Sequence, residues 1–244
     1  MSTDAPMPLV AHLRELRDRF RNALIAVFVA FLGLFPFANE LYTYVSEPLR
    51  SLLPEGSSMI ATEVTSPFLT PFKLSLVLAV FVAMPVILAQ LWGFIAPGLY
   101  KSEKRIAIPL LTSSIVLFYA GVAFAYYVVF PLLFGFFTTV GPGDISVMTD
   151  INRYLDFVLK LFFAFGLAFE VPVAAVILIL TGVVTADQLA KNRSFVVVGC
   201  FVMGMLLTPP DVISQTLLAL PMWLLFEVGL VMGRVLSRSP NEDD

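Results

Sequence analysis

The chain has 244 residues, of which 59% are hydrophobic and 14% are charged, and its net charge is −3. Soluble domains carry roughly 25% charged residues, and at a mean hydropathy of +0.90 a soluble fold of this size cannot bury its apolar surface. A cytosolic enzyme and a disordered chain are therefore excluded, and we expect an all-α integral membrane protein with a single domain over residues 1–244.

Residues 1–21 are predicted to form a cytoplasmic amphipathic segment. One helical face is apolar, with Leu9, Leu13, Leu16 and Phe20. The other face is charged, with Arg14, Glu15, Arg17, Asp18 and Arg19. Two interpretations remain open: a surface helix held by the i,i+4 pairs Glu15–Arg19 and Arg14–Asp18, or a docking surface.

Six apolar segments follow, and a bilayer core of about 30 Å requires about 20 residues of helix. They cover residues 22–38, 72–96, 106–137, 157–180, 195–208 and 212–233. The third is too long for a straight span and contains Pro109 and Pro131, so we expect a tilt, a kink or an extension past the bilayer. The fifth extends only about 20 Å from Phe195 to Leu207, which predicts either local thinning of the membrane or a re-entrant or buried helix.

Positive charges predict that both termini are cytoplasmic. They gather before the first span, in the second and fourth connections, and after the sixth span: Arg14, Arg17, Arg19, Arg21, Lys101, Lys104, Arg105, Lys191, Arg193, Arg234 and Arg238. The opposite side carries only Arg50 and Arg153, while Lys73 and Lys160 lie at span ends. Residues 237–244 then form a cytoplasmic tail.

The two outer loops are residues 39–70 and 138–153. The longer loop has apolar residues at helical spacing, namely Leu41, Tyr44, Val45, Leu49 and Leu52. This pattern predicts an amphipathic helix on the outer membrane surface, with Pro48 and Pro54 limiting its length.

Glu170 lies near the middle of the fourth span, where a charged and unpaired carboxylate costs about 3 kcal/mol. It must face protein, water or a partner, and intramembrane acids are functional by default. A protonated, structural hydrogen-bonding role is the alternative. Pro172 follows closely and frees a backbone carbonyl nearby.

Two cytoplasmic acids near the membrane, Glu15 and Glu103, suit a basic peptide, because arginine pairs bidentately with carboxylates. Glu103 considered alone is more readily a solvated charge in a basic loop, and the sequence does not show whether the two acids converge.

A polar group marks the outer end of the last two spans: Thr208, Asp211, Ser214 and Gln215. Such side chains bond across helices, although a turn in which Asp211 caps the sixth span explains part of the group. Gly229 and Gly233 have the spacing of a close-packing motif. Glu227 is expected near the cytoplasmic interface, where either snorkelling to the interface or a lysine or arginine partner suffices.

No constellation supports catalysis, so we expect no enzyme. His12 lies outside every span, and both a His-Glu-x-x-His motif and a phosphate-binding loop are absent. Energy for any transport must then come from elsewhere, such as an ion gradient.

Four ordered motifs resemble the TatC family, the multispanning signal-peptide receptor of the twin-arginine protein translocase. They are His12-Leu13-x-Glu15-Leu16-Arg17, Trp92-x-Phe94-Ile95-Ala96-Pro97-Gly98-Leu99-Tyr100 followed by Glu103, Phe169-Glu170 before Pro172, and Leu207-Thr208-Pro209-Pro210-Asp211. The similarity covers nearly the whole chain, including six spans, cytoplasmic termini and two short final helices.

The resemblance implies a receptor for folded cargo whose signal peptide carries adjacent arginines. Glu15 and Glu103 would pair with these arginines, and Arg17, Phe94 and Leu99 would shape the site. Glu170 would line a concave face of the bundle. The single-span partners TatB and TatA would bind at Met205, Thr208 and Gln215. Structural turns are assigned to Pro48, Pro209, Pro210 and Asp211.

The same resemblance implies transport driven by the proton-motive force without a cofactor, multimers, and a bacterial inner-membrane location. A proton-coupled transporter of a small solute, with Glu170 as the proton carrier, is the alternative function. It predicts a water-accessible cavity at the midplane and an inverted repeat, and the sequence shows no such repeat. A passive membrane scaffold is a third class, which needs no buried acid.

Overall fold

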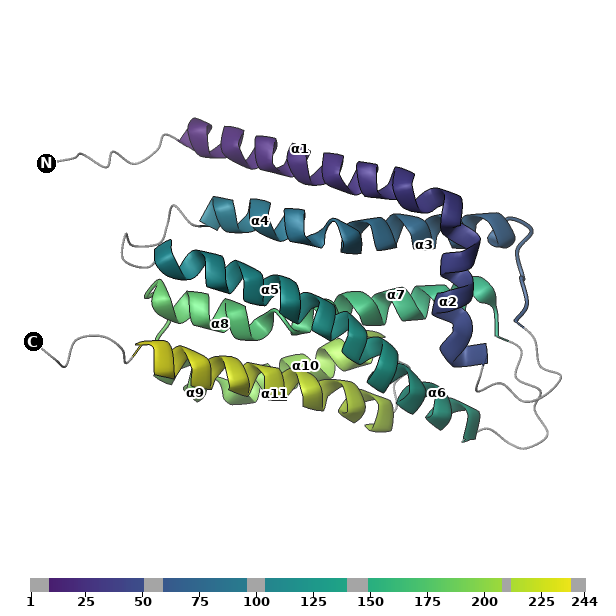
Figure 1. Ribbon diagram of the computed structural model, residues 1–244. Coiled ribbons are helices and arrows are strands. Elements are labelled where there is room, and N and C mark those ends of the chain that lie inside the picture. The colour runs from purple at the N-terminus through teal and green to yellow at the C-terminus, as the bar shows by residue number, and fades with distance from the viewer. Residues whose placement is uncertain (1–8, 51–58, 96–103, 140–148, 208–211, 238–244) are drawn as a thin grey trace, which may run out of the picture.

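A computed structural model describes residues 9–50, 59–95, 104–139, 149–207 and 212–237. These residues form a bundle of helices that run side by side (Figure 1). The elements in chain order are α1 (Leu9–Leu34), η1 (Phe35–Phe37), α2 (Ala38–Arg50), α3 (Ser66–Val82), α4 (Met84–Ile95), α5 (Lys104–Phe124), η3 (Ala125–Val129), α6 (Phe130–Thr139), α7 (Ile151–Ala168), α8 (Val171–Leu180), α9 (Ala186–Lys191), α10 (Arg193–Leu207) and α11 (Val212–Ser237).

The predicted spans correspond to helices in this bundle. Four continuous segments are long and apolar enough to cross a membrane: Leu13–Glu47, Ile108–Phe136, Ile151–Leu180 and Val212–Ser237. A fifth is the pair α3 and α4, bent by 48°, and α10 is a shorter apolar helix. The all-α, six-span architecture is thus confirmed.

The first span continues the amphipathic segment without a break. Helix α1 begins at Leu9 and therefore includes both the charged residues near Glu15 and the apolar stretch that follows. Leu13 and Phe20 are 61% and 64% exposed, so much of the apolar face of the N-terminal segment lies on the surface of the bundle. α1 contacts only one side of the bundle, chiefly α3 and α4.

Prolines explain why the second span bends. Pro85 stands at the second position of α4 and has no N–H to donate to the carbonyl of Phe81. The hydroxyl of Tyr119 donates to that carbonyl at 2.8 Å. The bend at Ala83 is therefore stabilised from α5, because a side chain of that helix replaces the missing backbone bond.

The third span extends past a bilayer rather than breaking. Its helical segment Ile108–Phe136 has 29 residues, or about 44 Å at 1.5 Å per residue. A π-helical turn, η3, occupies Ala125–Val129 just before Pro131. π-turns absorb local disruptions of the helical ladder, so the helix passes Pro131 and continues as α6.

Helix α2 runs across one end of the bundle, transverse to the long helices (Figure 1). The expected amphipathic helix therefore exists, but part of it packs inward: Tyr42 and Val45 are buried, whereas Tyr44 is exposed. Tyr154 Oη donates to the carbonyl of Val45 at 2.9 Å, and Tyr126 Oη donates to that of Tyr44 at 3.1 Å. These tyrosines fasten α2 to the bundle.

The core lies between α3, α5, η3 and α7 and is rich in phenylalanine. Phe118, Phe130 and Phe165 are fully buried. Phe81 makes edge contacts with Phe118 and Phe163 at centroid distances of 5.6 and 4.9 Å. Offset and edge geometry is favourable for aromatic pairs, so the bend at Ala83 is packed from both sides.

The beginning of α1 and the end of α11 lie at the same end of the bundle, opposite α2 (Figure 1). The ends of α4 and α8 and the start of α5 lie there too. We call this the N-terminal end and the other the α2 end. In a chain that crosses a membrane an even number of times, the first helix starts and the last helix ends on the same side, as α1 and α11 do here.

Candidate functional site

Glu170 stands at the break between α7 and α8, where Pro172 interrupts the helical ladder. Ser114 Oγ on α5 donates to Glu170 Oε2 at 2.7 Å. The other oxygen, Oε1, is buried and has no hydrogen-bond partner among the described residues. Within the described residues, one hydrogen bond therefore holds the carboxyl group, and its second oxygen can still take part in another hydrogen bond inside the bundle.

The bond to Glu170 belongs to a longer chain. Trp92 Nε1 on α4 donates to Ser114 Oγ at 3.4 Å, and both residues are buried. Trp92 lies two residues before Phe94 in the sequence. Three side chains therefore connect the motif at the end of α4 with the intramembrane acid, and the sequence predicted no such connection.

Glu15 forms an ion pair within α1. Arg19 donates to Glu15 Oε1 from Nη2 at 2.6 Å and from Nε at 2.9 Å. The two side chains are 27% and 25% exposed, so the pair is partly shielded from water. The i,i+4 pair anticipated from the sequence is present, and the other one, Arg14–Asp18, is not among the ion pairs of the described residues.

Arg19 also lies against α4. A side chain at Gly93 would overlap the guanidinium group of Arg19, so the glycine permits this close approach. Next to it is a small hollow of about 150 Å³ between α1 and α4, lined by Leu16, Arg19, Phe20, Ala23, Ile87, Gln90, Leu91 and Phe94. Arg19 pairs with Glu15 and lines the same hollow as Phe94, so the two predicted site residues both lie near Arg19.

The remaining members of the expected signal-peptide site are only partly placed. Arg17 is exposed and pairs with the adjacent Asp18 at 2.9 Å. Leu99 and Glu103 lie outside the described residues. They belong to the connection between α4 and α5, whose flanking helix ends lie at the N-terminal end of the bundle (Figure 1).

The expected partner-binding surface falls on the antiparallel pair α10 and α11. Met205 is 51% exposed, and Gln215 is half-buried. A side chain at Gly204 would lie 3.2 Å from the carbonyl oxygen of Gln215, so the backbones approach closely there. Thr208, Pro209, Pro210 and Asp211 lie outside the described residues. Pro48, assigned to a turn, instead lies within the last turn of α2.

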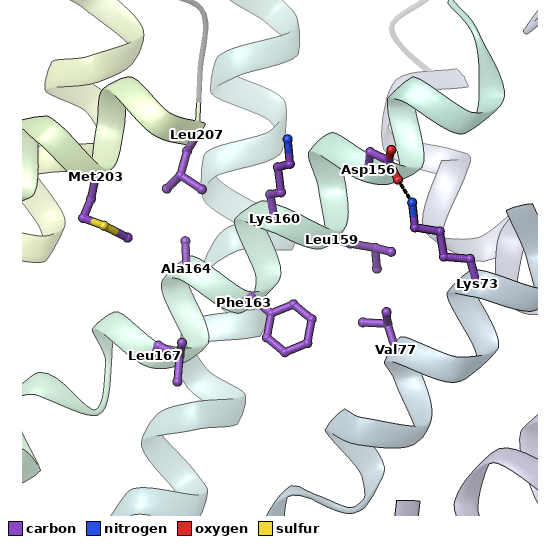
Figure 2. A pocket seen from close by; sticks show the side chains of 10 residues that line it. All are labelled: Lys73, Val77, Asp156, Leu159, Lys160, Phe163, Ala164, Leu167, Met203 and Leu207. Atoms are coloured by element: carbon purple, nitrogen blue, oxygen red, sulfur yellow. Dashed lines mark hydrogen bonds and ion pairs between the residues drawn. The ribbon is translucent and has the colours of Figure 1, made fainter. Parts of the chain in front are cut away.

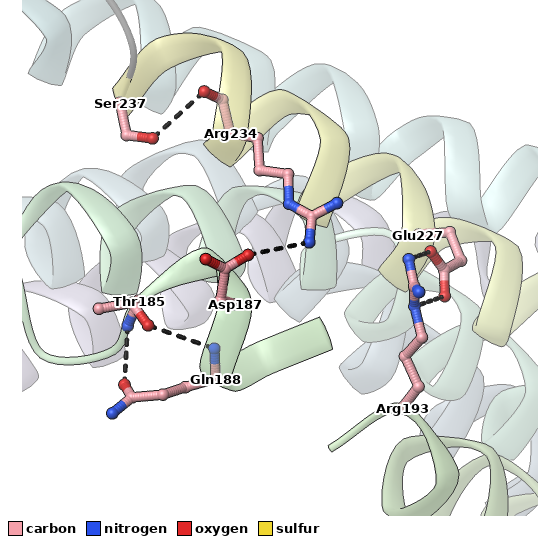
Figure 3. A network of polar contacts seen from close by, with 7 residues as sticks. All are labelled: Thr185, Asp187, Gln188, Arg193, Glu227, Arg234 and Ser237. Atoms are coloured by element: carbon pink, nitrogen blue, oxygen red, sulfur yellow. Dashed lines mark hydrogen bonds and ion pairs between the residues drawn. The ribbon is translucent and has the colours of Figure 1, made fainter. Parts of the chain in front are cut away.

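A polar network joins α9, α10 and α11 near the N-terminal end (Figure 3). Arg193 contacts Glu227 through two atoms, Nε at 2.7 Å and Nη2 at 2.8 Å. Arg234 Nη2 contacts Asp187 at 3.2 Å. Glu227 therefore has a basic partner on α10, one of the two possibilities that the sequence left open, and Arg234 links α11 to α9.

The glycines of α11 make close contact with α8. A side chain at Gly229 would lie 2.6 Å from Pro172 Cα, and one at Gly233 would overlap Ile179. The spacing of the two glycines alone was only a weak indication of close helix packing. In the structure, both glycines lie where α11 approaches α8 closely. The backbone of α11 thereby reaches the break that holds Glu170.

Asp150 joins the two outer loops, a role that the sequence analysis missed. Its Oδ2 accepts from the hydroxyl of Thr62 at 2.6 Å and from the Thr62 amide at 2.9 Å. Its Oδ1 accepts from the amides of Asn152 and Arg153, which caps α7. The Thr62 hydroxyl, followed by the backbone donors, lowers the pKa of Asp150 to about 2.

A signal for part of this arrangement was available. An aspartate before the apolar run of α7 has the position of an N-cap. Its second partner, Thr62, lies far away in the chain, and no local pattern identifies it. Among the described residues, no group of three or more His, Cys, Asp or Glu side chains could hold a metal ion.

The comparisons with known proteins agree on one family. The family model described as "Sec-independent protein translocase protein (TatC)" matches residues 11–221. A protein of that name from Azotobacter chroococcum mcd 1 is 63% identical over 95% of this chain and 91% of its own length. The protein of that name from Escherichia coli K12 is 56% identical over 96% of this chain and 91% of its own.

A solved structure is also similar. The crystal structure of the twin-arginine translocase receptor TatC superposes with a TM-score of 0.82, at 39% sequence identity, over 93% of this chain and 100% of that chain. Both the sequence and the arrangement of helices therefore match over nearly the full length.

Proposed function

Because this chain belongs to the TatC family of Sec-independent protein translocase proteins, we propose that it is the receptor subunit that binds twin-arginine signal peptides. Its relatives carry the translocase name, and the similar crystal structure is titled as the twin-arginine receptor. These names describe a translocase component and not an enzyme. They give no support to the alternative of a solute transporter.

The observation that carries the proposal is the Glu15–Arg19 pair. The Glu15 carboxylate already binds a guanidinium group through two donors, in a partly shielded place at the N-terminal end. A guanidinium from a peptide makes the same charge-assisted bonds. The twin-arginine peptide would thus meet an acid whose geometry suits arginine better than lysine.

Glu103 supplies the second acid in this proposal. It immediately precedes Lys104, the first residue of α5, and α5 starts at the same end as Glu15 (Figure 1). Phe94 and Leu99 would provide apolar contacts for the peptide beside the arginines, and Arg17 would shape the charged rim. The hollow that Phe94 lines between α1 and α4 supports an apolar contact there.

We place the N-terminal end in the cytoplasm of a bacterial cell and the chain in its inner membrane. The basic residues at that end support this orientation. Single-span subunits of the TatA and TatB type would dock along α10 and α11, near Met205, Thr208 and Gln215. The proton-motive force would drive export of folded proteins, and Glu170 would serve the passage of cargo.

The experiment is a titration of the purified chain in detergent with a labelled twin-arginine peptide and its twin-lysine version. Glu15→Gln and Glu103→Gln are compared with wild type. Glu40→Gln on α2 is the matched control, since Glu40 is an exposed acid at the α2 end.

Wild type should prefer arginine, and each site variant should weaken binding by about tenfold, the loss of one charge-assisted contact. The control should bind as wild type does. Equal binding of both peptides, unchanged in the Glu15 and Glu103 variants, would contradict the proposed site. Loss of binding in the control as well would indicate a general charge effect.

A further inference from the structure

A groove of about 490 Å³ opens between α3, α7 and α10. This volume is in the range of sites that hold a small ligand, about 300–1,000 Å³. Its lining comprises Lys73, Val77, Asp156, Leu159, Lys160, Phe163, Ala164, Leu167, Met203 and Leu207. None of these residues belongs to the proposed signal-peptide site.

The charged side chains gather at one end of the groove (Figure 2). The ammonium group of Lys73 pairs with the carboxylate of Asp156. Lys160 projects toward the same end (Figure 2), is exposed, and has no ion-pair partner among the described residues. The three side chains together carry a net charge of +1, so this end of the groove is suited to an anion.

The other end of the groove is apolar. Phe163, Leu167 and Val77 lie below the charged group in the same view (Figure 2). Met203 and Leu167 are 45% and 59% exposed, so a surface of hydrocarbon character continues from the charged end along the helices. Lys73 is the eighth residue of α3 and Asp156 is the sixth residue of α7, and both helices start at the α2 end of the bundle.

This distribution of charge along the helices matches one kind of molecule. A lysine within a span directs its ammonium group to the membrane interface and leaves its stem among apolar groups. Basic pockets between membrane helices bind lipid head groups. An anionic head group needs a cation at the interface, and its acyl chain needs an apolar wall that continues toward the midplane.

We propose that this groove binds an anionic phospholipid in the leaflet on the α2 side. Lys160 and Lys73 receive the phosphate group, and one acyl chain lies along Phe163 and Leu167. Asp156 limits the charge of the site by holding Lys73. The proposal does not depend on the signal-peptide function, because it uses other residues at the opposite end of the bundle.

The test measures lipid retention by native mass spectrometry of the purified full chain. Detergent micelles are mixed with equal amounts of phosphatidylglycerol and phosphatidylethanolamine. Wild type should retain phosphatidylglycerol preferentially. Lys160→Gln should reduce this retention about fivefold, the effect of losing one partly exposed charge contact.

Asp156→Asn gives a change of the opposite sign. It releases Lys73 and raises the charge of the site from +1 to +2, so retention of phosphatidylglycerol should increase. Loss of the folded groove would instead abolish the preference for phosphatidylglycerol over phosphatidylethanolamine. The matched controls are Lys191→Gln and Asp187→Asn on α9, which change the same charges near the N-terminal end and should leave retention unchanged.

Three outcomes would overturn the proposal. Equal retention of both lipids by wild type would indicate ordinary boundary lipid. Equal effects of the groove variants and the α9 controls would indicate a response to net charge alone. Equal binding of phosphatidylglycerol and of glycerophosphoglycerol, which is the same head group without acyl chains, would indicate a site for free anions, with no role for the apolar wall.

Discussion

At the scale of single residues, Glu170 shows how an acid is held inside an apolar bundle. Among the described residues, Ser114 supplies the hydrogen bond to its carboxyl group, and Trp92 in turn orients Ser114. Each of the three residues lies on a different part of the chain. The acid is therefore positioned by packing between helices, and its position is sensitive to the loss of a single hydroxyl group.

Removal of that hydroxyl by Ser114→Ala should lower the free energy of unfolding by about 1 kcal/mol, because hydrogen bonds between membrane helices average about 0.6 and reach about 1.7 kcal/mol. Unfolding in mixed detergent micelles measures the change. Thr112→Ala is the control, since Thr112 bonds only within its own helix, to the Ile108 carbonyl. An equal loss in both variants would mean that the bond to Glu170 contributes nothing specific.

The Glu15–Arg19 pair leads to a prediction about affinity. In the proposed site, a peptide guanidinium would compete with Arg19 for Glu15. Arg19→Gln should then tighten binding of a twin-arginine peptide about two- to fivefold, as expected for a partly exposed pair worth up to about 1 kcal/mol. The peptide titration measures this change. Arg21→Gln, an exposed arginine that pairs with Asp18, should leave affinity unaltered. Weaker binding in Arg19→Gln would show that Arg19 orients the acid for the peptide.

At the scale of elements, side chains take over backbone bonds that prolines remove. Pro48 and Pro85 cannot donate to the carbonyls of Tyr44 and Phe81, and the hydroxyls of Tyr126 and Tyr119 bond to them instead. A helix can then bend or end while the carbonyl opposite the proline still accepts a hydrogen bond. The bent second span and the transverse α2 both follow this rule.

The contact between α8 and α11 predicts a contrast between two glycines. Gly229→Ala should destabilise the chain by about 1–3 kcal/mol, because the added methyl group would meet the backbone at Pro172 and must push the helices apart. Gly199→Ala has open space and should be neutral or slightly stabilising. Unfolding in mixed micelles compares the two. Equal stability would mean that α8 and α11 separate easily.

Asp150 predicts a pH dependence at the junction of the outer loops. Its pKa is lowered to about 2 in the folded chain, against about 3.9 for an unperturbed aspartate. The stability that its carboxylate contributes is therefore complete above about pH 4 and is lost as the pH falls to about 2. Asp150→Asn should remove this part of the pH profile and lower stability at pH 7.

The measurement is the unfolding midpoint of wild type and variant between pH 7 and pH 2. Glu63→Gln provides a control, because Glu63 is exposed in the same connection. A profile that keeps its shape in Asp150→Asn would contradict the assignment.

At the scale of the whole molecule, the helices differ greatly in length. α10 has 15 residues, or about 22 Å, while the third span extends about twice as far. A bilayer core of about 30 Å cannot match both. The bundle therefore presents a short side at α10, next to the groove and to the expected partner surface. The expectation that the last helix is short as well was wrong, because α11 has 26 residues.

This mismatch predicts a dependence on bilayer thickness. The chain should unfold more slowly in vesicles of short-chain than of long-chain phosphatidylcholine, because a thinner membrane reduces the mismatch at α10. Extending α10 by one turn of leucine should shift the optimum toward thicker bilayers. Rates that do not vary with thickness, or an optimum unmoved by the extension, would contradict the short side as the cause.

The sequence by itself determined the number of spans, the place of the intramembrane acid and the family. Hydropathy, proline positions and motif order are properties of the sequence itself, and they do not depend on which helices pack together. Glu15 and Phe94 were selected from short, continuous motifs, and their role in peptide binding stays a prediction. Even the length of α10 was close to its expected value.

Only the tertiary structure decided which groups meet. The Trp92–Ser114–Glu170 chain and the bond from Thr62 to Asp150 join residues far apart in the sequence. The groove with Lys160 arises from three helices that no local pattern brings together. Such contacts depend on how bends and close glycine packing orient entire helices, and that orientation is a property of the packed bundle rather than of any one segment.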